Sequence, residues 1–64
     1  MKFEFIIRDI KTWEEPFYSK LIPEEDYAAV KSAYENKMKE LNDKDLRLLI
    51  NKLDDEGEFL EVIQ

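Results

Sequence analysis

The stretch that decides most of the fold is PEEDYAAVKSAYENKMKEL, residues 23–41. Proline suits the first position of a helix, and the three acidic residues after it complement the positive end of the helix dipole. Apolar residues then recur along one helical stripe, and they are Tyr27, Val30, Tyr34, Met38 and Leu41. This spacing is typical of a helix with one buried face. The stretch therefore predicts an amphipathic helix with both tyrosines on the side that faces the core.

A second helix is predicted directly after the first. Asn42 or Asp43 can cap its start, because short polar side chains bond to free N–H groups there. The apolar residues that follow at i, i+3, i+4 and i+7 are Leu46, Leu49, Ile50 and Leu53. This pattern indicates a helix that faces a core, with Leu48 off the stripe. We expect it to end near Gly57, which adopts a positive φ at no steric cost.

Strands are expected at both ends of the chain. Residues 2–8, KFEFIIR, alternate apolar and charged side chains over most of their length, the pattern of a half-buried strand. Residues 58–63, EFLEVI, indicate a closing strand that is apolar on both sides and pairs beside the first. Residues 17–22, FYSKLI, fit either a further strand or an irregular lead-in to the helix.

These elements make the expected fold class α+β, in one small acidic domain over residues 1–64. We expect a two- or three-stranded sheet, with its N- and C-terminal strands paired, covered on one face by two helices. The chain is close to the lower size limit for unaided folding. Its hydrophobic content of 44% is nevertheless too high for a disordered tail.

The residue inventory argues against an enzyme. The chain has no cysteine, no histidine and one glycine. It therefore lacks a thiolate nucleophile, the commonest general base and a glycine-rich phosphate loop. An EF-hand frame with Gly57 at its sixth position puts Lys52 and Ile63 where acidic ligands belong. We expect no catalytic residue, no cofactor and no metal site.

The net charge of −6 is distributed unevenly. Residues 1–22 are balanced, whereas residues 23–64 hold twelve acids against six bases. From residue 54 onward there is no base at all, and the five acids are Asp54, Asp55, Glu56, Glu58 and Glu61. Such a field repels nucleic acid and anionic lipid and attracts basic protein surfaces. These five residues are therefore candidates for binding a partner.

The spacing of the acids allows a more specific hypothesis. On an extended strand, Glu56 and Glu58 would project on one side about 7 Å apart, similar to the advance between successive phosphates of a DNA strand. This favours DNA-mimic-like docking on a basic surface. The alternative is that the acids are solvated and serve only to keep the protein soluble.

A second candidate surface is the polar loop TWEEPFY, residues 12–18. Tryptophan is over-represented in the energetic centres of protein interfaces, so Trp13, Glu14 and Glu15 are candidate partner-binding residues. The alternative is that Trp13 folds back and fills the open face of the sheet as part of a small core. The exposure of the indole distinguishes the two interpretations.

The sequence therefore predicts a small, non-catalytic acidic interaction protein. It would bind, and inhibit or modulate, a protein partner through a basic surface such as that of a DNA- or RNA-binding protein. Direct binding to nucleic acid or membrane is not expected. Every apolar run is far shorter than a membrane span and no secretory signal pattern is present, so we expect a cytoplasmic location. The alternative function is an accessory or structural subunit that forms a homodimer, or completes a larger complex, through the edge of its closing strand.

Overall fold

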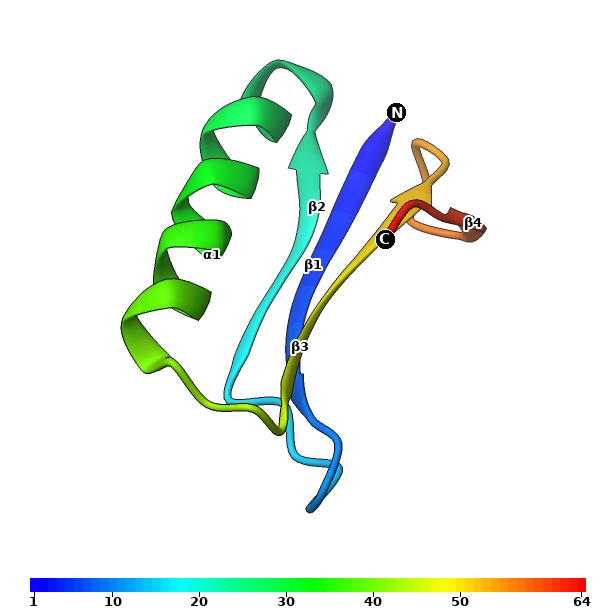
Figure 1. Ribbon diagram of the computed structural model, residues 1–64. Coiled ribbons are helices and arrows are strands. Elements are labelled where there is room, and N and C mark those ends of the chain that lie inside the picture. Colours follow the sequence, from blue (N-terminus) through cyan, green and yellow to red (C-terminus); the bar gives the residue numbers. More distant parts are fainter.

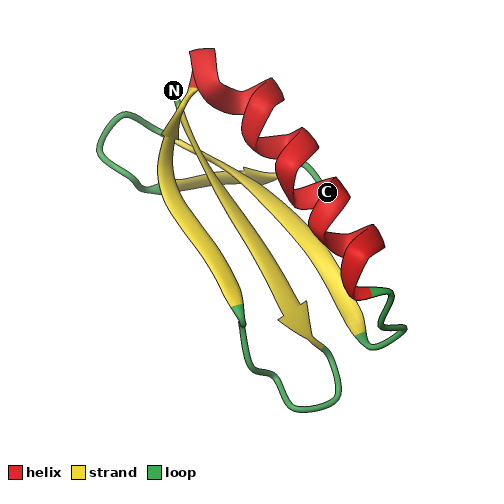
Figure 2. Cartoon of the chain, turned by 90° about the vertical axis from the view of Figure 1, so that its left-hand side faces the viewer, coloured by secondary structure: helices red, strands yellow, loops and turns green.

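Figure 1 shows the computed structural model, which describes all residues from 1 to 64. In chain order the elements are β1 (Lys2–Asp9), β2 (Phe17–Pro23), the 3-10 turn η1 (Glu24–Asp26), α1 (Tyr27–Leu41), β3 (Leu46–Leu53) and β4 (Phe59–Val62). The strands form one antiparallel sheet in the order β2-β1-β3-β4. α1 lies across one face of this sheet, and we call the other the helix-free face (Figure 2). The α+β class is confirmed.

The core lies between α1 and the two central strands. Phe5 and Ile50 are directly opposite each other on β1 and β3, and both are fully buried. Phe3 and Ile7 share the face of Phe5, because successive side chains of a strand alternate between faces, and both are buried. The strand predicted over residues 2–8 is thus confirmed.

The helix predicted over residues 23–41 is confirmed from residue 24 onward, as η1 followed by α1, whereas Pro23, predicted as its first residue, ends strand β2. The ring of Tyr27 lies 4.4 Å from that of Phe3, and the ring of Tyr34 lies 5.3 Å from that of Phe5, measured between centroids. Both tyrosines therefore face the core, as predicted. α1 stops at Asn42, whose φ of 45° is the left-handed conformation that asparagine tolerates at a helix end.

The second predicted helix is wrong, because Leu46–Leu53 forms strand β3. Its apolar residues fit a helical stripe, but Leu48, which falls off that stripe, also packs against the core cluster in the strand. All eight residues of β3 pair with β1. A short helix is marginal by itself, whereas the strand gives every one of these residues a partner on a buried neighbouring strand.

The predicted pairing of the terminal strands is also wrong, because β3 lies between β1 and β4. The connection through α1 runs from β2 to β3, and it places β3 on the far side of β1. Residues 17–22, for which two interpretations were open, belong to strand β2. The sheet therefore has four strands rather than two or three, and one helix rather than two covers it.

Candidate functional site

The acidic segment predicted to be extended instead forms the turn between β3 and β4, so the strand-like spacing of Glu56 and Glu58 is wrong. Asp54 organises this turn, because its Oδ1 accepts the backbone N–H groups of both glutamates at 2.9 Å. The N–H of Gly57 donates to the Asp54 carbonyl at 3.0 Å, and Gly57 has a φ of 88°. Aspartate commonly stabilises turns in this way. The carboxylate of Asp54 is therefore engaged within the turn.

Asp55 is engaged too, although it is exposed. Its Oδ1 accepts a hydrogen bond from the amino group of Met1 at 2.8 Å. This hydrogen bond and the charge of the amino group lower the pKa of Asp55. The side chains of Glu56, Glu58 and Glu61 are exposed and belong to none of the three ion pairs. Three of the five acids are therefore free to meet a partner.

The turn lies beside a second acidic segment. A methyl group on Gly57 would approach Leu21 Cδ2, near the end of β2, to 3.0 Å. η1 follows β2 and carries three exposed acids, Glu24, Glu25 and Asp26. η1 and the β3–β4 turn lie at the same end of the molecule as the N-terminus (Figure 1). We call this region the acidic end. Sequence reasoning assigned the η1 acids only to the start of the helix, because their proximity to the turn depends on the sheet.

β4 is an edge strand whose apolar side chains are exposed. The exposed fractions are 59% for Phe59, 49% for Leu60, 65% for Val62 and 42% for Ile63. We call these four residues the β4 strip. β4 pairs only with β3, along residues 51–53, so its outer edge has no neighbouring strand. Glu58 precedes the strip and Glu61 interrupts it. The strip is thus an apolar surface with free carboxylates beside it.

The loop between β1 and β2 presents Trp13 to solvent. Trp13 is 70% exposed, so its interpretation as part of the core is wrong. Asp9 holds the loop, because its Oδ1 accepts the N–H of Lys11 at 2.8 Å and its carbonyl accepts the N–H of Trp13 at 2.7 Å. Trp13 itself has a φ of 66°. The bonds to Asp9 hold this left-handed conformation, which costs energy for a bulky residue.

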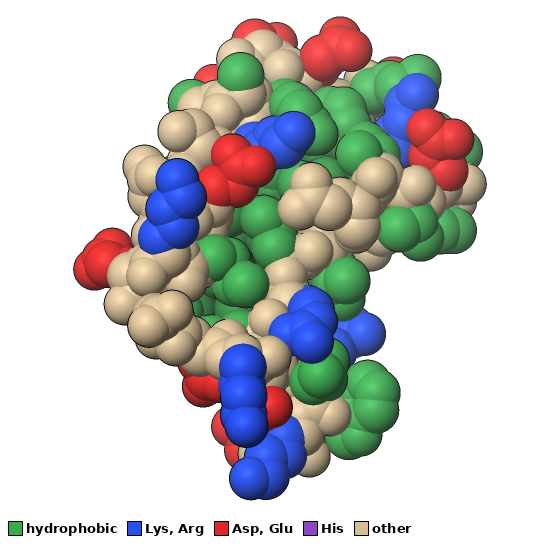
Figure 3. All heavy atoms as spheres, viewed as in Figure 1, with side chains coloured by type: hydrophobic (Ala, Val, Ile, Leu, Met, Phe, Trp, Pro, Cys, Tyr) green, Lys and Arg blue, Asp and Glu red, His purple; other side chains and the backbone are tan.

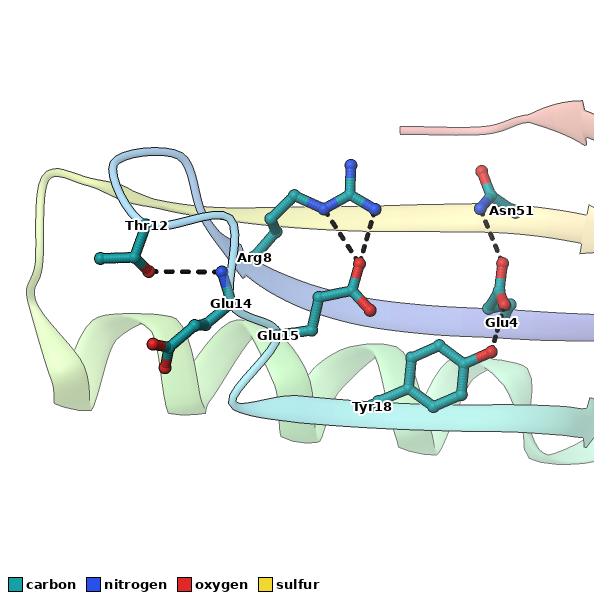
Figure 4. Close-up of polar contacts among 7 residues, drawn as sticks. All are labelled: Glu4, Arg8, Thr12, Glu14, Glu15, Tyr18 and Asn51. Atoms are coloured by element: carbon teal, nitrogen blue, oxygen red, sulfur yellow. Dashed lines mark hydrogen bonds and ion pairs between the residues drawn. The ribbon is translucent and has the colours of Figure 1, made fainter.

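The loop carboxylates differ in their surroundings. Glu15 accepts two hydrogen bonds from Arg8, from Nε at 3.0 Å and from Nη2 at 2.6 Å (Figure 4). Glu14 is exposed, and its backbone N–H donates to the hydroxyl of Thr12. The loop lies at the end of the sheet opposite to the acidic end (Figure 1). The two groups of predicted partner-binding residues therefore do not form one site.

A row of polar side chains crosses the helix-free face from β2 to β3, and sequence reasoning did not find it. The carboxylate of Glu4 accepts hydrogen bonds from the hydroxyl of Tyr18 at 2.6 Å and from Asn51 Nδ2 at 2.8 Å (Figure 4). Glu4 and Asn51 are opposite each other in the register of β1 and β3. The signal in the sequence was a charged residue at the outward position of the central strand, but its two partners depend on that register.

The row shifts the ionisation of its members in opposite directions. The hydrogen bond to Glu4, more than any other effect, raises the pKa of Tyr18 to about 12. Partial burial works to raise the pKa of Glu4, but hydrogen bonds from Asn51 and Tyr18 and the nearby cations outweigh it and lower that pKa. The hydrogen bonds of this row connect three strands, and the shifted pKa values of Tyr18 and Glu4 make the row measurable in solution.

Two further properties bear on the chemistry of the surface. No group of three or more carboxylates is arranged to hold a metal ion. α1 is neither long enough nor apolar enough to cross a membrane.

No protein-family model, no curated protein and no solved structure matches this chain.

Proposed function

We propose that this protein is a small, non-catalytic interaction protein that docks its β3–β4 hairpin on a basic surface of a partner protein. The observation that carries the proposal is the exposed β4 strip with Glu58 and Glu61 in the same strand region and Glu56 in the adjoining turn. Apolar residues gathered on an edge strand, with free charges beside them, are typical of a surface that meets another protein.

The two kinds of side chain would contribute differently to binding. The free carboxylates and the other acids of the acidic end attract a basic surface from a distance and raise the association rate. Burial of the β4 strip slows dissociation, because it removes apolar surface from water. DNA- and RNA-binding proteins carry dense basic surfaces, so docking on one of them would block or modulate access of its nucleic acid. The net charge of −6 favours such a partner over nucleic acid or an anionic membrane.

The experiment compares capture by two variants of equal charge. The test variant carries Glu56→Gln, Glu58→Gln and Glu61→Gln. Asp54 is left intact because it forms the turn. The control variant neutralises three exposed acids outside the hairpin and the acidic end, by Glu35→Gln, Glu40→Gln and Asp43→Asn. Each protein is immobilised and exposed to the heparin-retained fraction of a cell lysate, at low and at high salt.

The wild type and the control variant should capture a protein that high salt and free heparin release. The test variant should no longer capture this protein. Val62→Thr, which keeps the shape and strand propensity of the residue, should shorten the residence time of the captured protein. Equal capture by the test and control variants, or capture that is the same at low and at high salt, would contradict the proposal.

A second candidate function is self-association through the outer edge of β4, as an accessory or structural subunit. It is favoured by the missing neighbour of β4 together with the exposure of the β4 strip. Two copies could pair their β4 edges into one continuous sheet. Light scattering over a range of concentrations tests this. A concentration-dependent dimer that Val62→Lys dissociates would support it, and a strict monomer at the highest concentration would exclude it.

A further inference from the structure

A groove of about 700 Å³ runs between α1 and β3. Its hydrophobic lining residues are Met38 of α1 and Leu48 of β3, and its charged lining residues are Glu35, Lys39 and Arg47. Figure 3 shows the hollow between the helix and the sheet, with hydrophobic side chains on its floor. The groove is distinct from the β4 strip, because none of the strip residues lines it.

The backbone of β3 beside this groove lacks a strand on its outer side. The backbone N–H and C=O of Ile50 point away from β1, because the N–H donates to the carbonyl of Gln64 and the C=O accepts the N–H of Ile63. In an antiparallel strand every second residue has the same orientation, so Leu48 also directs its N–H and C=O outward. The ladder with β4 covers only residues 51–53. Leu48 therefore presents one free donor and one free acceptor at the groove.

The end of the groove near the start of β3 is lined by two cations. Nη1 of Arg47 donates to the carbonyls of Lys44 at 2.6 Å and of Leu46 at 2.8 Å. These bonds fix the guanidinium and leave its other N–H groups able to bind a carboxylate. Lys39 lies near the end of α1, and only residues 42–45 separate α1 from β3. Lys39 and Arg47 therefore line the same end of the groove.

We propose that this groove binds an extended peptide with an acidic end, which pairs with the free backbone groups of Leu48 at the outer edge of β3. The peptide would run antiparallel to β3, in line with β4, so that its C-terminal part reaches Lys39 and Arg47. The peptide residue opposite Leu48 exchanges two backbone hydrogen bonds with it, and its side chain faces Met38 and α1. Strand addition between a sheet edge and a helix is a general mode of peptide recognition, and the charges select an acidic segment.

The probes are N-acetylated peptides of alternating threonine and valine that end in two glutamates, two glutamines or two lysines. Binding is followed by fluorescence anisotropy and by the amide resonances of the labelled protein. The glutamate peptide should bind at least about tenfold more tightly than the lysine peptide. Its binding should shift the Leu48 amide and protect it from hydrogen exchange.

Backbone methylation of the peptide separates strand pairing from simple charge attraction. With valine side chains facing α1, the valine N–H groups point at β3 and the threonine N–H groups point away. Methylation of the nitrogen of the valine opposite Leu48 should therefore weaken binding about tenfold or more, whereas methylation of the threonine nitrogens should leave it unchanged.

Two protein variants complete the test. Lys39→Gln should weaken binding of the glutamate peptide, and Lys11→Gln, which removes an exposed charge outside the groove, should not. Absence of binding by all three peptides at millimolar concentration, binding without a change at the Leu48 amide, or equal binding of the two methylated peptides would each overturn the proposal.

Discussion

Replacement of Glu4 by glutamine should release Tyr18 from its raised pKa. In the wild type the phenol donates to the Glu4 carboxylate at 2.6 Å, so its ionisation would place two negative charges in contact, and its pKa is raised to about 12. Glu4→Gln keeps the size of the side chain and removes the charge. The pKa of Tyr18 should then return toward its ordinary value of 10.0.

The stability effect follows from the same contacts. A hydrogen bond to a charged group contributes about 1.5–3 kcal/mol when it is buried. Tyr18 is 47% exposed, so solvent screening reduces the contribution of its bond to about 1 kcal/mol or less. We expect Tyr18→Phe to lower the free energy of unfolding at neutral pH by about that amount. In Glu4→Gln, which keeps a weaker acceptor, Tyr18→Phe should cost less, and the difference measures the coupling.

The pH dependence has a definite sign at each end. The pKa of Glu4 is lowered by folding, so its contribution is present above its unfolded pKa and is lost as the pH falls through the folded value. The pKa of Tyr18 is raised by folding, so its contribution is present below pH 10.0 and is lost as the pH rises toward about 12. Glu4→Gln should flatten both dependences, which urea unfolding at several pH values measures.

The phenolate absorbance of the folded protein is the decisive assay. The wild type should show a tyrosine that ionises at about pH 12. This ionisation should be absent in Tyr18→Phe and shifted to lower pH in Glu4→Gln. Glu24→Gln, which neutralises an exposed acid in η1, is the matched control and should leave the titration unchanged. A Tyr18 that ionises near pH 10.0 in the folded wild type, or one that Glu4→Gln does not move, would refute the reasoning.

Three further predictions concern the turn, the loop and the N-terminus. Gly57→Ala should destabilise the protein by about 1–3 kcal/mol in urea unfolding, because φ is 88° and the new methyl meets Leu21; an unchanged midpoint would show that the turn relaxes. Trp13→Ala should change stability by less than about 0.5 kcal/mol, since Trp13 is 70% exposed, and a larger loss would mean that the indole packs in solution. Acetylation of the N-terminal amino group should raise the pKa of Asp55 in an NMR titration, because it removes the charge that lowers this pKa, and an unchanged pKa would contradict the contact with Met1.

Those elements whose pattern is local could be predicted from the sequence alone. β1 follows from the alternation of Phe3, Phe5 and Ile7, and α1 follows from its apolar stripe and from the acids of η1 that precede it. A surface helix and a half-buried strand each give a periodic pattern of apolar residues in the sequence, because each has one solvent-exposed face and one buried face. The positive φ of Gly57 was also readable, although the turn that uses it connects two strands and does not end a helix.

The conformation of residues 46–53 and the surroundings of the charges depend on contacts between distant parts of the chain. Leu49 of β3 stands at an outward position between Arg47 and Asn51, which breaks the alternation of the strand. The leucines of β3 therefore fitted a helical stripe until β1 supplied a partner for every residue. The same sheet brings Asp55 to the N-terminal amine, while the β3–β4 turn engages Asp54 and leaves Glu56 and Glu58 free. Charge along the chain is local information, but whether a carboxylate is paired depends on which distant backbone or cation the strand register places beside it.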